Sequence, residues 1–343
     1  MNLLIRADAS TRMGSGHVMR CLALAQACRG QGGRVRFACA EIPPALEARL
    51  RSEGMDPTAV PPPAAGPGDM ARTAALAREM DAEWVVLDGY QFGPDSQEAM
   101  KGAGFKLLSI DDYGHARRYV SDLVLNQNIC AAPGLYQERA PETHLLLGTR
   151  YVLLRREFWP WRGGRRRVAP EARTVLVTMG GSDPGNVTLG VIDALTALNN
   201  ARLDVRIVVG HGNPHLAVLE EAVTAAPCPM RLLKDVEDMA GVMAGADIAV
   251  SSGGSTSWEL LLMGLPGVLL ALAANQDPIA AGLEQAGAAL TCRAPAPGDG
   301  SLRIALEGLI GDPQKRQTIV ERGYDLVDGY GAARVLSAMA MSC

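Results

Sequence analysis

The sequence has few aromatic residues, little net charge and no long hydrophobic run. Only 4% of its 343 residues are aromatic whereas 48% are hydrophobic, so we expect aliphatic, alanine-rich cores. A net charge of −4 argues against the positive surface that binding to nucleic acid requires. No stretch approaches the ~20 apolar residues of a membrane span. The chain starts with a strand pattern instead of a basic segment before an apolar one, so we expect no secretory signal.

Paired cysteines and metal-ligand motifs are also missing. The seven cysteines are odd in number and none forms a C-x-x-C pair. This usage is typical of small, buried, reduced thiols in a cytoplasmic protein. The five histidines include no H-E-x-x-H pattern. We therefore expect no metal site and no cofactor.

Short apolar runs that alternate with helical patterns are what the sequence does contain. Its length suggests about two domains at roughly 150 residues each. Strands that alternate with helices form parallel β-α-β units, so the pattern predicts an α/β fold with two doubly wound, Rossmann-like domains. Ligands bind just after the strands of such sheets, here around a shared cleft. The strand-like runs are residues 2–8, 35–40, 84–90, 106–112, 122–128, 173–181, 203–210, 247–254 and 266–273.

Two stretches rich in proline, glycine or arginine indicate breaks in this alternation. Residues 57–69 contain clustered prolines and glycines and are expected to form a surface loop. Residues 161–170, WRGGRRRVAP, lack apolar periodicity and predict an exposed linker, although their arginines leave open a contact with an acidic partner. The predicted domains are residues 1–160 before this linker and residues 171–330 after it.

The first motif, MGSGHVMR at residues 13–20, follows the first strand and leads into a helical pattern over residues 17–29. Backbone N–H groups at a helix start attract anions, and Gly14 and Gly16 permit close approach. Neither the lysine of a P-loop nor the third glycine of a dinucleotide fingerprint is present. His17 is instead offered to the ligand, and a neutral imidazole can act as a base. The alternative is that His17 only caps the helix or stacks on a ligand.

The second motif, SSGGSTSWELLLMGLP at residues 251–266, joins a strand to a helix in the second half. The N–H groups of Gly254, Ser255 and Thr256 and the helix dipole favour a phosphate or diphosphate. Glu259, one turn into the helix, is placed to accept two ribose hydroxyls. The alternative is an ordinary solvated carboxylate. A similar glycine turn, MGGSDPGN, follows the first strand of this half.

Together the motifs resemble a known family. In chain order they are RADASTRMGSGHVMR, VVLDGY, LLSIDD, VLNQN, GTRYVLLRREF, TMGGSDPGN and SSGGSTSWELLLMGLP. From residue 1 to about residue 290 this set resembles the UDP-sugar hydrolases of pseudaminic acid biosynthesis, which are related to the GT-B glycosyltransferase MurG. The resemblance implies a GT-B-like fold, two Rossmann-like domains facing a central cleft, and a C-terminal helix over residues 331–343 that crosses back to the first domain. One departure is Gly89, where the family pattern has a histidine between an aspartate and a tyrosine.

The resemblance also implies which residues act on the substrate. His17 is the expected catalytic base, and the second domain is expected to hold UDP. Glu259 is expected at the ribose, Gly254–Thr256 at the diphosphate, and Val236 and Met239 at the uracil. The full set of expected substrate-binding residues is Asp8, Gly14, Gly16, Arg20, Asp88, Tyr90, Asp111, Asn126, Asn128, Gly180, Gly181, Val236, Met239, Gly254, Ser255, Thr256, Glu259, Asn275 and Gln276.

The implied activity is hydrolysis of UDP-2,4-diacetamido-2,4,6-trideoxy-β-L-altropyranose to UDP and the free sugar, without a metal. Water attacks the anomeric carbon with inversion, in a pathway that supplies flagellin glycosylation. The expected partner is this small-molecule substrate alone, with no nucleic acid and no membrane span, and we expect a cytoplasmic monomer. Two alternatives stay open: a GT-B glycosyltransferase with a UDP-sugar donor, and a UDP-sugar-binding protein without catalysis. A dinucleotide oxidoreductase fits less well, because neither glycine loop has the required spacing.

Overall fold

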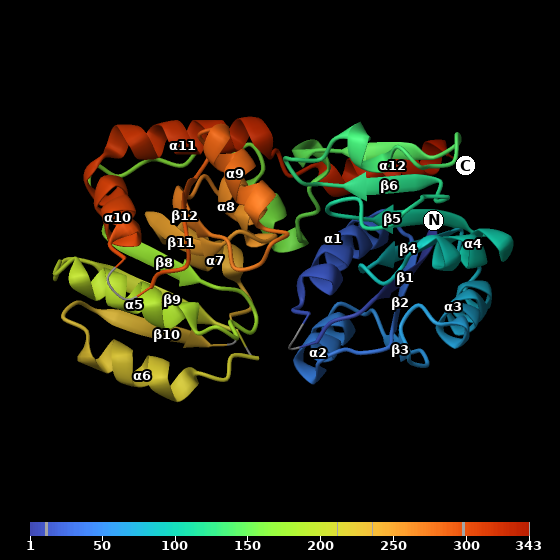
Figure 1. Cartoon of the computed structure of the whole chain (residues 1–343), viewed down its shortest axis with the longest axis horizontal. Coiled ribbons are helices and arrows are strands. Elements are labelled where there is room, and N and C mark those ends of the chain that lie inside the picture. Colours follow the sequence, from blue (N-terminus) through green and yellow to red (C-terminus); the bar gives the residue numbers. More distant parts are fainter. Residues whose placement is uncertain (11–12, 211, 235, 297–298, 343) are drawn as a thin grey trace. The chain divides into compact units, whose positions relative to one another are not determined.

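The chain folds into two compact α/β units. The computed structural model describes residues 1–10, 13–210, 212–234, 236–296 and 299–342. One unit is Met1–Arg156 with Gly329–Cys343, and the other is Glu157–Asp328 (Figure 1). The boundary thus falls shortly before the predicted end of the first domain at residue 160, and the end of the chain belongs to the first unit.

A parallel sheet forms the centre of the first unit. Its strands in the described residues are β1 (Asn2–Ala7), β2 (Arg34–Cys39), β3 (Pro57–Ala59), β4 (Trp84–Asp88), β5 (Lys106–Ile110), β6 (Leu123–Asn126) and β7 (His144–Leu147). They lie in the order β3-β2-β1-β4-β5-β6-β7. The winding direction changes between β1 and β4, and Ala7 is level with Asp88 there. Ligands of open parallel sheets bind outside the carboxyl ends of strands at such a point.

The helices of the first unit cover this sheet. They are α1 (Gly16–Gly30), α2 (Pro44–Ser52), α3 (Pro67–Glu79), α4 (Pro94–Gly102) and α12 (Gly331–Met341), with short 3₁₀ helices η1 (Pro133–Tyr136) and η2 (Thr149–Tyr151). Most of α1 is buried, because it packs on the sheet and also against α12. The loop predicted over residues 57–69 is shorter than expected. Its start pairs with β2 as β3, and Pro67 opens α3, where a missing N–H costs nothing.

The second unit repeats the architecture. Its strands in the described residues are β8 (Thr174–Thr178), β9 (Asp204–Val209), β10 (Met230–Lys234), β11 (Ile248–Ser252), β12 (Gly267–Leu270) and β13 (Leu290–Cys292), in the order β10-β9-β8-β11-β12-β13. Its helices are η3 (Arg156–Trp161, which starts at the unit boundary), α5 (Val187–Ala197), α6 (Leu216–Ala225), α7 (Met239–Ala244), α8 (Thr256–Leu262), α9 (Asp277–Gln285), α10 (Ser301–Gly311) and α11 (Pro313–Leu326). The core is aliphatic, with Val175, Ile207 and Val250 fully buried. The predicted pair of doubly wound Rossmann-like domains is confirmed.

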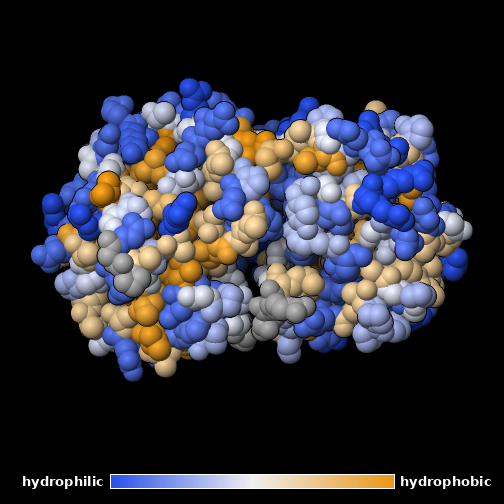
Figure 2. Space-filling view, viewed as in Figure 1, coloured by the Kyte–Doolittle hydropathy of each residue, from blue (hydrophilic) through white to orange (hydrophobic). Residues whose placement is uncertain are grey.

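The helices and the drawn surface can also be compared with the expectations from the sequence. Within the part of the chain that the structure describes, no helix is long and apolar enough to cross a membrane. On the face drawn in Figure 2, hydrophobic residues gather more on the second unit than on the first.

The expectation that the cysteines are buried holds for Cys21, Cys28, Cys39 and Cys228 but not for two others. Cys130 is exposed in the turn that follows β6, and Cys292 is half-buried on the edge strand β13. Cys343 lies outside the described residues.

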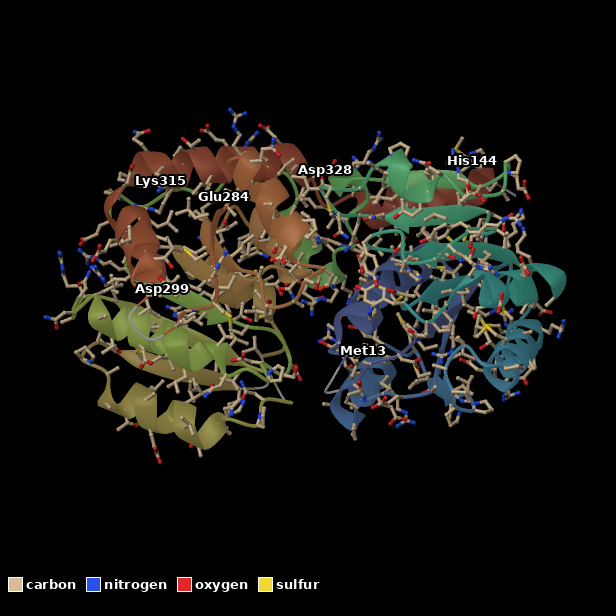
Figure 3. The ribbon with its side chains drawn as sticks, viewed as in Figure 1. Met13, His144, Glu284, Asp299, Lys315 and Asp328 are labelled. Atoms are coloured by element: carbon tan, nitrogen blue, oxygen red, sulfur yellow. The ribbon has the colours of Figure 1, made fainter. Side chains whose placement is uncertain are left out.

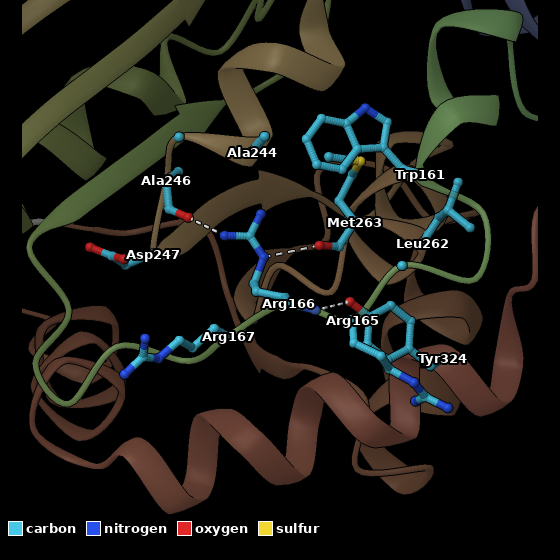
Figure 4. Close-up of a pocket in the computed structure, with 12 residues that line it drawn as sticks. Trp161, Arg165, Arg166, Arg167, Ala244, Ala246, Asp247, Leu262, Met263 and Tyr324 are labelled. Atoms are coloured by element: carbon cyan, nitrogen blue, oxygen red, sulfur yellow. Dashed lines mark hydrogen bonds between the residues drawn. The ribbon is translucent and has the colours of Figure 1, made fainter.

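Arg166 is a structural residue of the second unit instead of part of an exposed linker. Its guanidinium donates to the carbonyls of Met243 (2.8 Å), Ala246 (2.5 Å) and Met263 (3.0 Å), which lie at or just beyond the carboxyl ends of α7 and α8. Figure 4 draws the bonds to Ala246 and Met263. A cation at helix carboxyl ends is favourable. Burial lowers the pKa of Arg166. The adjoining pocket of about 380 Å³ lies at the amino end of β11, which is the edge of the sheet opposite the glycine turns.

Candidate functional site

The candidate site of the first unit lies at the carboxyl ends of β1 and β4, where α1 begins. His17 is the second residue of α1, and Asp88 is the last residue of β4. His17 Nδ1 lies 2.7 Å from Oδ1 of Asp88. Asp88 is fully buried and His17 is 8% exposed, so water screens this contact little. The fold therefore joins two predicted site residues into one pair.

Arg20, one turn further along α1, fixes the charge of Asp88. Its Nε and Nη2 donate to the two carboxylate oxygens of Asp88, each at 2.7 Å. Cys21 Sγ donates to the same carboxylate at 3.3 Å. Burial opposes ionisation of Asp88, but Arg20 and then His17 outweigh it, so the pKa of Asp88 lies well below its usual range. Asp88 is therefore ionised at neutral pH.

The hydrogen bonds decide which nitrogen of His17 carries the proton. An ionised carboxylate only accepts, so the 2.7 Å contact with Asp88 requires a proton on Nδ1. The Nη2 of Arg20 lies 3.2 Å from Nδ1 and also donates to Oδ1 of Asp88 at the shorter distance of 2.7 Å. Nε2 makes no hydrogen bond within the described residues, and in a neutral imidazole it is then the nitrogen that holds the lone pair. The same arrangement orients the histidine base of hydrolytic triads.

Asp112 is a functional candidate that the sequence analysis missed. Arg20 Nη1 donates to its Oδ1 at 2.7 Å, and Asn128 Nδ2 donates to the same oxygen at 2.9 Å. Tyr90 donates its hydroxyl to Oδ2 at 2.7 Å. Burial opposes ionisation of Asp112, but the Arg20 charge holds its pKa below the usual value. The only sequence signal was a pair of aspartates after β5, and side chains that alternate in direction made the choice between them ambiguous.

Asp111, the aspartate expected at the sugar, holds its own loop instead. It is fully buried and accepts three backbone N–H bonds from residues 112–114. His115 Nδ1 donates to it at 2.9 Å and the Tyr119 hydroxyl at 2.6 Å. Burial opposes its ionisation, but these donors hold the pKa of Asp111 well below its usual range. Its role in the structure is to position the loop that carries Asp112.

Two further expected sugar contacts are turned into the protein. Asp8 accepts a 2.6 Å hydrogen bond from the buried Arg6 and bonds from the backbone N–H groups of residues 40 and 41. Asn126 is fully buried, and its amide donates to the Tyr136 hydroxyl at 2.8 Å. Both side chains bond to the protein at the carboxyl edge of the sheet.

Glycines allow the backbone conformations of this edge. Gly14 has φ +81° and closes a turn on Ser10, while Gly16 begins α1. Gly89 has φ +152°, a conformation that side chains rarely adopt. A Cβ at Gly89 would lie 2.6 Å from Oε1 of Gln91. A histidine at this position would strain the backbone and displace the side-chain amide of Gln91.

The candidate site of the second unit consists mainly of backbone. Gly180, with φ +88°, follows β8, and a Cβ built on it would lie 4.0 Å from Ser252 Oγ at the end of β11. Gly254 and the N-cap Ser255 connect β11 to α8. A Cβ on Gly254 would lie 3.8 Å from Nε2 of Gln276. The fold thus gathers two glycine turns and Gln276 at one edge of the sheet.

The other predicted residues of this unit lie around that edge. Ser255 is exposed and its side chain caps no helix N–H, so its hydroxyl is available to a ligand. Glu259 is half-buried in the first turn of α8. The remaining expected residues are Thr256 at the start of α8, Gly181 after Gly180, Val236 after β10, Met239 at the start of α7, and Asn275 before α9. No group of three or more metal-ligating side chains occurs among the residues that the structure describes.

Comparison with known proteins agrees with the motifs. The chain is 27% identical over 289 residues to UDP-2,4-diacetamido-2,4,6-trideoxy-beta-L-altropyranose hydrolase of Campylobacter jejuni, which covers 84% of this chain and 97% of that protein. The resemblance is confirmed. No family model matches the chain.

Solved structures show the same fold. MurG of Acinetobacter baumannii has a TM-score of 0.67 and 16% identity, and the match covers 99% of this chain and all of that chain. Glycosyltransferase VinC, solved with dTDP, has a TM-score of 0.67 and 15% identity over 100% of this chain and 99% of that chain. At these identities the likeness concerns the fold, which is GT-B-like.

Proposed function

We propose that this chain hydrolyses a UDP-linked sugar by attack of water at the anomeric carbon. The observation that carries the proposal is the His17–Asp88 pair, in which Nδ1 lies 2.7 Å from a buried carboxylate, so that a neutral imidazole would present Nε2 as the base. The likeness to a UDP-sugar hydrolase over 97% of that protein's length supports the same conclusion. The substrate that this relative's name specifies, a UDP-linked diacetamido-trideoxy sugar, is the one we propose here, within pseudaminic acid biosynthesis.

In the proposed reaction His17 Nε2 takes a proton from the attacking water. The bond from water oxygen to the anomeric carbon forms as the bond to the UDP oxygen breaks, so the configuration inverts. The imidazolium that results is stabilised by Asp88, which Arg20 keeps ionised. General-base help of this kind contributes about 10²–10⁴-fold to the rate.

We propose that the second unit supplies the contacts to UDP. The N–H groups of Gly254–Thr256, with those of Gly180 and Gly181, would donate to the diphosphate oxygens and stabilise the charge that develops as it leaves. The carboxylate of Glu259 would accept hydrogen bonds from the ribose hydroxyls. The uracil would lie near Val236 and Met239. None of these contacts needs a metal ion.

The test is incubation with a panel of UDP-sugars and no acceptor, with detection of UDP and free sugar. We expect release of both, and His17→Asn should lower kcat at least about 100-fold while UDP still binds. His144→Asn is the matched control, because His144 is an exposed histidine on β7 of the same unit (Figure 3). Wild-type turnover in His17→Asn would contradict the assignment of the base.

A second candidate is a glycosyltransferase, which the likeness to MurG favours. Such an enzyme would transfer the sugar to an alcohol, and His17 would then deprotonate that alcohol. The same panel separates the two. A transferase releases UDP only when an acceptor is added, whereas a hydrolase releases UDP and sugar in buffer alone.

A further inference from the structure

A run of aromatic rings starts at His17, although aromatic residues make up only 4% of the chain. The ring of Tyr90 meets the ring of His17 edge-on at a centroid distance of 5.0 Å. Tyr113 follows, with its ring centroid 5.0 Å from that of Tyr90. Beyond these the run continues through His115, Tyr119 and Tyr136. A chain poor in aromatics thus concentrates them beside the proposed base.

The exposure of the rings varies along the run. Tyr119 and Tyr136 are each 1% exposed, whereas Tyr90 is 37% exposed and Tyr113 is 45% exposed. Leu135, 38% exposed, packs against the backbone next to Tyr113, because a Cβ built on Gly114 would lie 3.2 Å from the Leu135 Cβ. We name Tyr90, Tyr113 and Leu135 the tyrosine ledge. Two of its three residues are the tyrosines that follow His17 in the run.

Hydrogen bonds hold the tyrosine ledge in place. The Tyr90 hydroxyl donates to Asp112 at 2.7 Å. The backbone N–H groups of Tyr113 and Gly114 donate to Asp111 at 3.2 Å and 2.8 Å. The rings are therefore exposed on a fixed loop, and a ligand that covers them does not have to order it first.

We propose that the tyrosine ledge binds apolar substituents of the sugar and so selects for acetamido and deoxy sugars over fully hydroxylated ones. This rests on the proposed function, because it needs the sugar to lie beside His17. A methyl group on an exposed ring removes apolar area from water. A hydroxyl in its place, lying over the ring face of Tyr113 or over Leu135, would lose water and gain no hydrogen-bond partner from these apolar surfaces.

Two variants of Tyr113 test the ledge without touching His17. Tyr113→Ala removes the ring, and Tyr113→Phe keeps it without the hydroxyl. Tyr330→Ala is the matched control, because Tyr330 is 48% exposed and lies at the start of α12 in the same unit. Affinities for the UDP-diacetamido-trideoxy sugar, UDP-glucose and UDP are measured by calorimetry in the His17→Asn background, which avoids turnover. KM and kcat are measured with His17 intact.

We expect Tyr113→Ala to weaken binding of the diacetamido-trideoxy nucleotide about 2- to 10-fold and to leave UDP-glucose and UDP unchanged. KM should rise by a similar factor, kcat should change little, and Tyr113→Phe and Tyr330→Ala should match their parent. Equal losses for both sugar nucleotides, or no loss for either, would overturn the ledge. Selective binding that Tyr113→Ala abolishes, with no turnover of any UDP-sugar, would support the ledge and reject the proposed hydrolysis.

Discussion

The two sheets share one winding pattern, but different chemical groups line their carboxyl edges. In the first unit charged side chains are paired with each other: Asp88 binds His17 and Arg20, and Arg20 also binds Asp112. In the second unit the edge is formed by the glycine turns at Gly180 and Gly254. Side chains can hold a proton at a fixed atom, whereas bare backbone N–H groups suit a phosphate. The contrast suggests that chemistry and nucleotide binding are separable by mutation.

The largest effect should come from Asp88→Asn. The amide can no longer hold the proton of His17 on Nδ1, and a loss of about 10⁴-fold in kcat follows when a histidine base takes the wrong tautomer. UDP affinity should be unchanged. Initial rates and UDP titration measure the two quantities, and a thermal melt reports whether the loss of the Arg20 pair unfolds the chain. Near-normal kcat in a folded variant would show that Asp88 does not orient the base.

Arg166→Ala should destabilise the second unit and leave the chemistry of the first untouched. The variant strips a charged donor from three carbonyls at the ends of α7 and α8, at a cost of about 2–4 kcal/mol. Urea unfolding measures this loss. At permissive temperature kcat should match wild type. Arg167→Ala, a neighbour that is exposed, should change neither quantity, and equal loss in both variants would mean that Arg166 has no special role.

His115→Asn should lower stability in a pH-dependent way. Burial favours neutral His115, but the hydrogen bond and charge of Asp111 outweigh it, so its pKa is raised. A raised pKa means that the stabilisation is complete below the unfolded value of about 6.5 and is lost as pH rises through the folded pKa. Below that value we expect the variant to be less stable by about 1.5–3 kcal/mol. Urea unfolding at acidic and alkaline pH measures the trend, and a difference that grows with pH would contradict it.

Gly254→Val should give the smallest effect, and we expect this effect on the interaction of the protein with the nucleotide. An added side chain finds only ordinary contact within the protein, with Gln276 Nε2 at 3.8 Å from the Cβ, but it covers the N–H groups proposed to bind phosphate. We expect Kd for UDP to rise about 10-fold, equivalent to about 1.4 kcal/mol, and kcat to fall as well, because the same N–H groups are proposed to stabilise the departing diphosphate. Gly300→Val is the control, because a Cβ there meets nothing within 4 Å. Equal effects in both variants would remove the phosphate assignment.

The sequence predicted the strands that are buried in the middle of each sheet better than those at its edges. The strand-like runs found from the sequence are the inner strands of both sheets, whereas β3, β7, β10 and β13 were missed. These four are the sheet edges in the described residues. An edge strand has one neighbour and less burial, so its sequence carries a weaker apolar signal.

Some residues of the candidate site could be predicted from the sequence and others could not. His17 and Asp88 could be found, because His17 lies at the start of a strongly patterned helix and Asp88 ends a buried strand. The choice between Asp111 and Asp112 could not, since it depends on which carboxylate the loop donors of residues 112–114 take up. Arg166 was mistaken for linker because its three acceptors are carbonyls distant in sequence, and backbone acceptors leave no trace in residue type.

Hydrolysis of the UDP-sugar in ¹⁸O-labelled water tests the central claim most directly. If His17 directs water at the anomeric carbon, the oxygen from water joins the sugar and the UDP released carries no label by mass spectrometry. UDP that carries ¹⁸O on its terminal phosphate would mean attack at phosphorus, and would contradict the account of His17 as the base for attack at carbon.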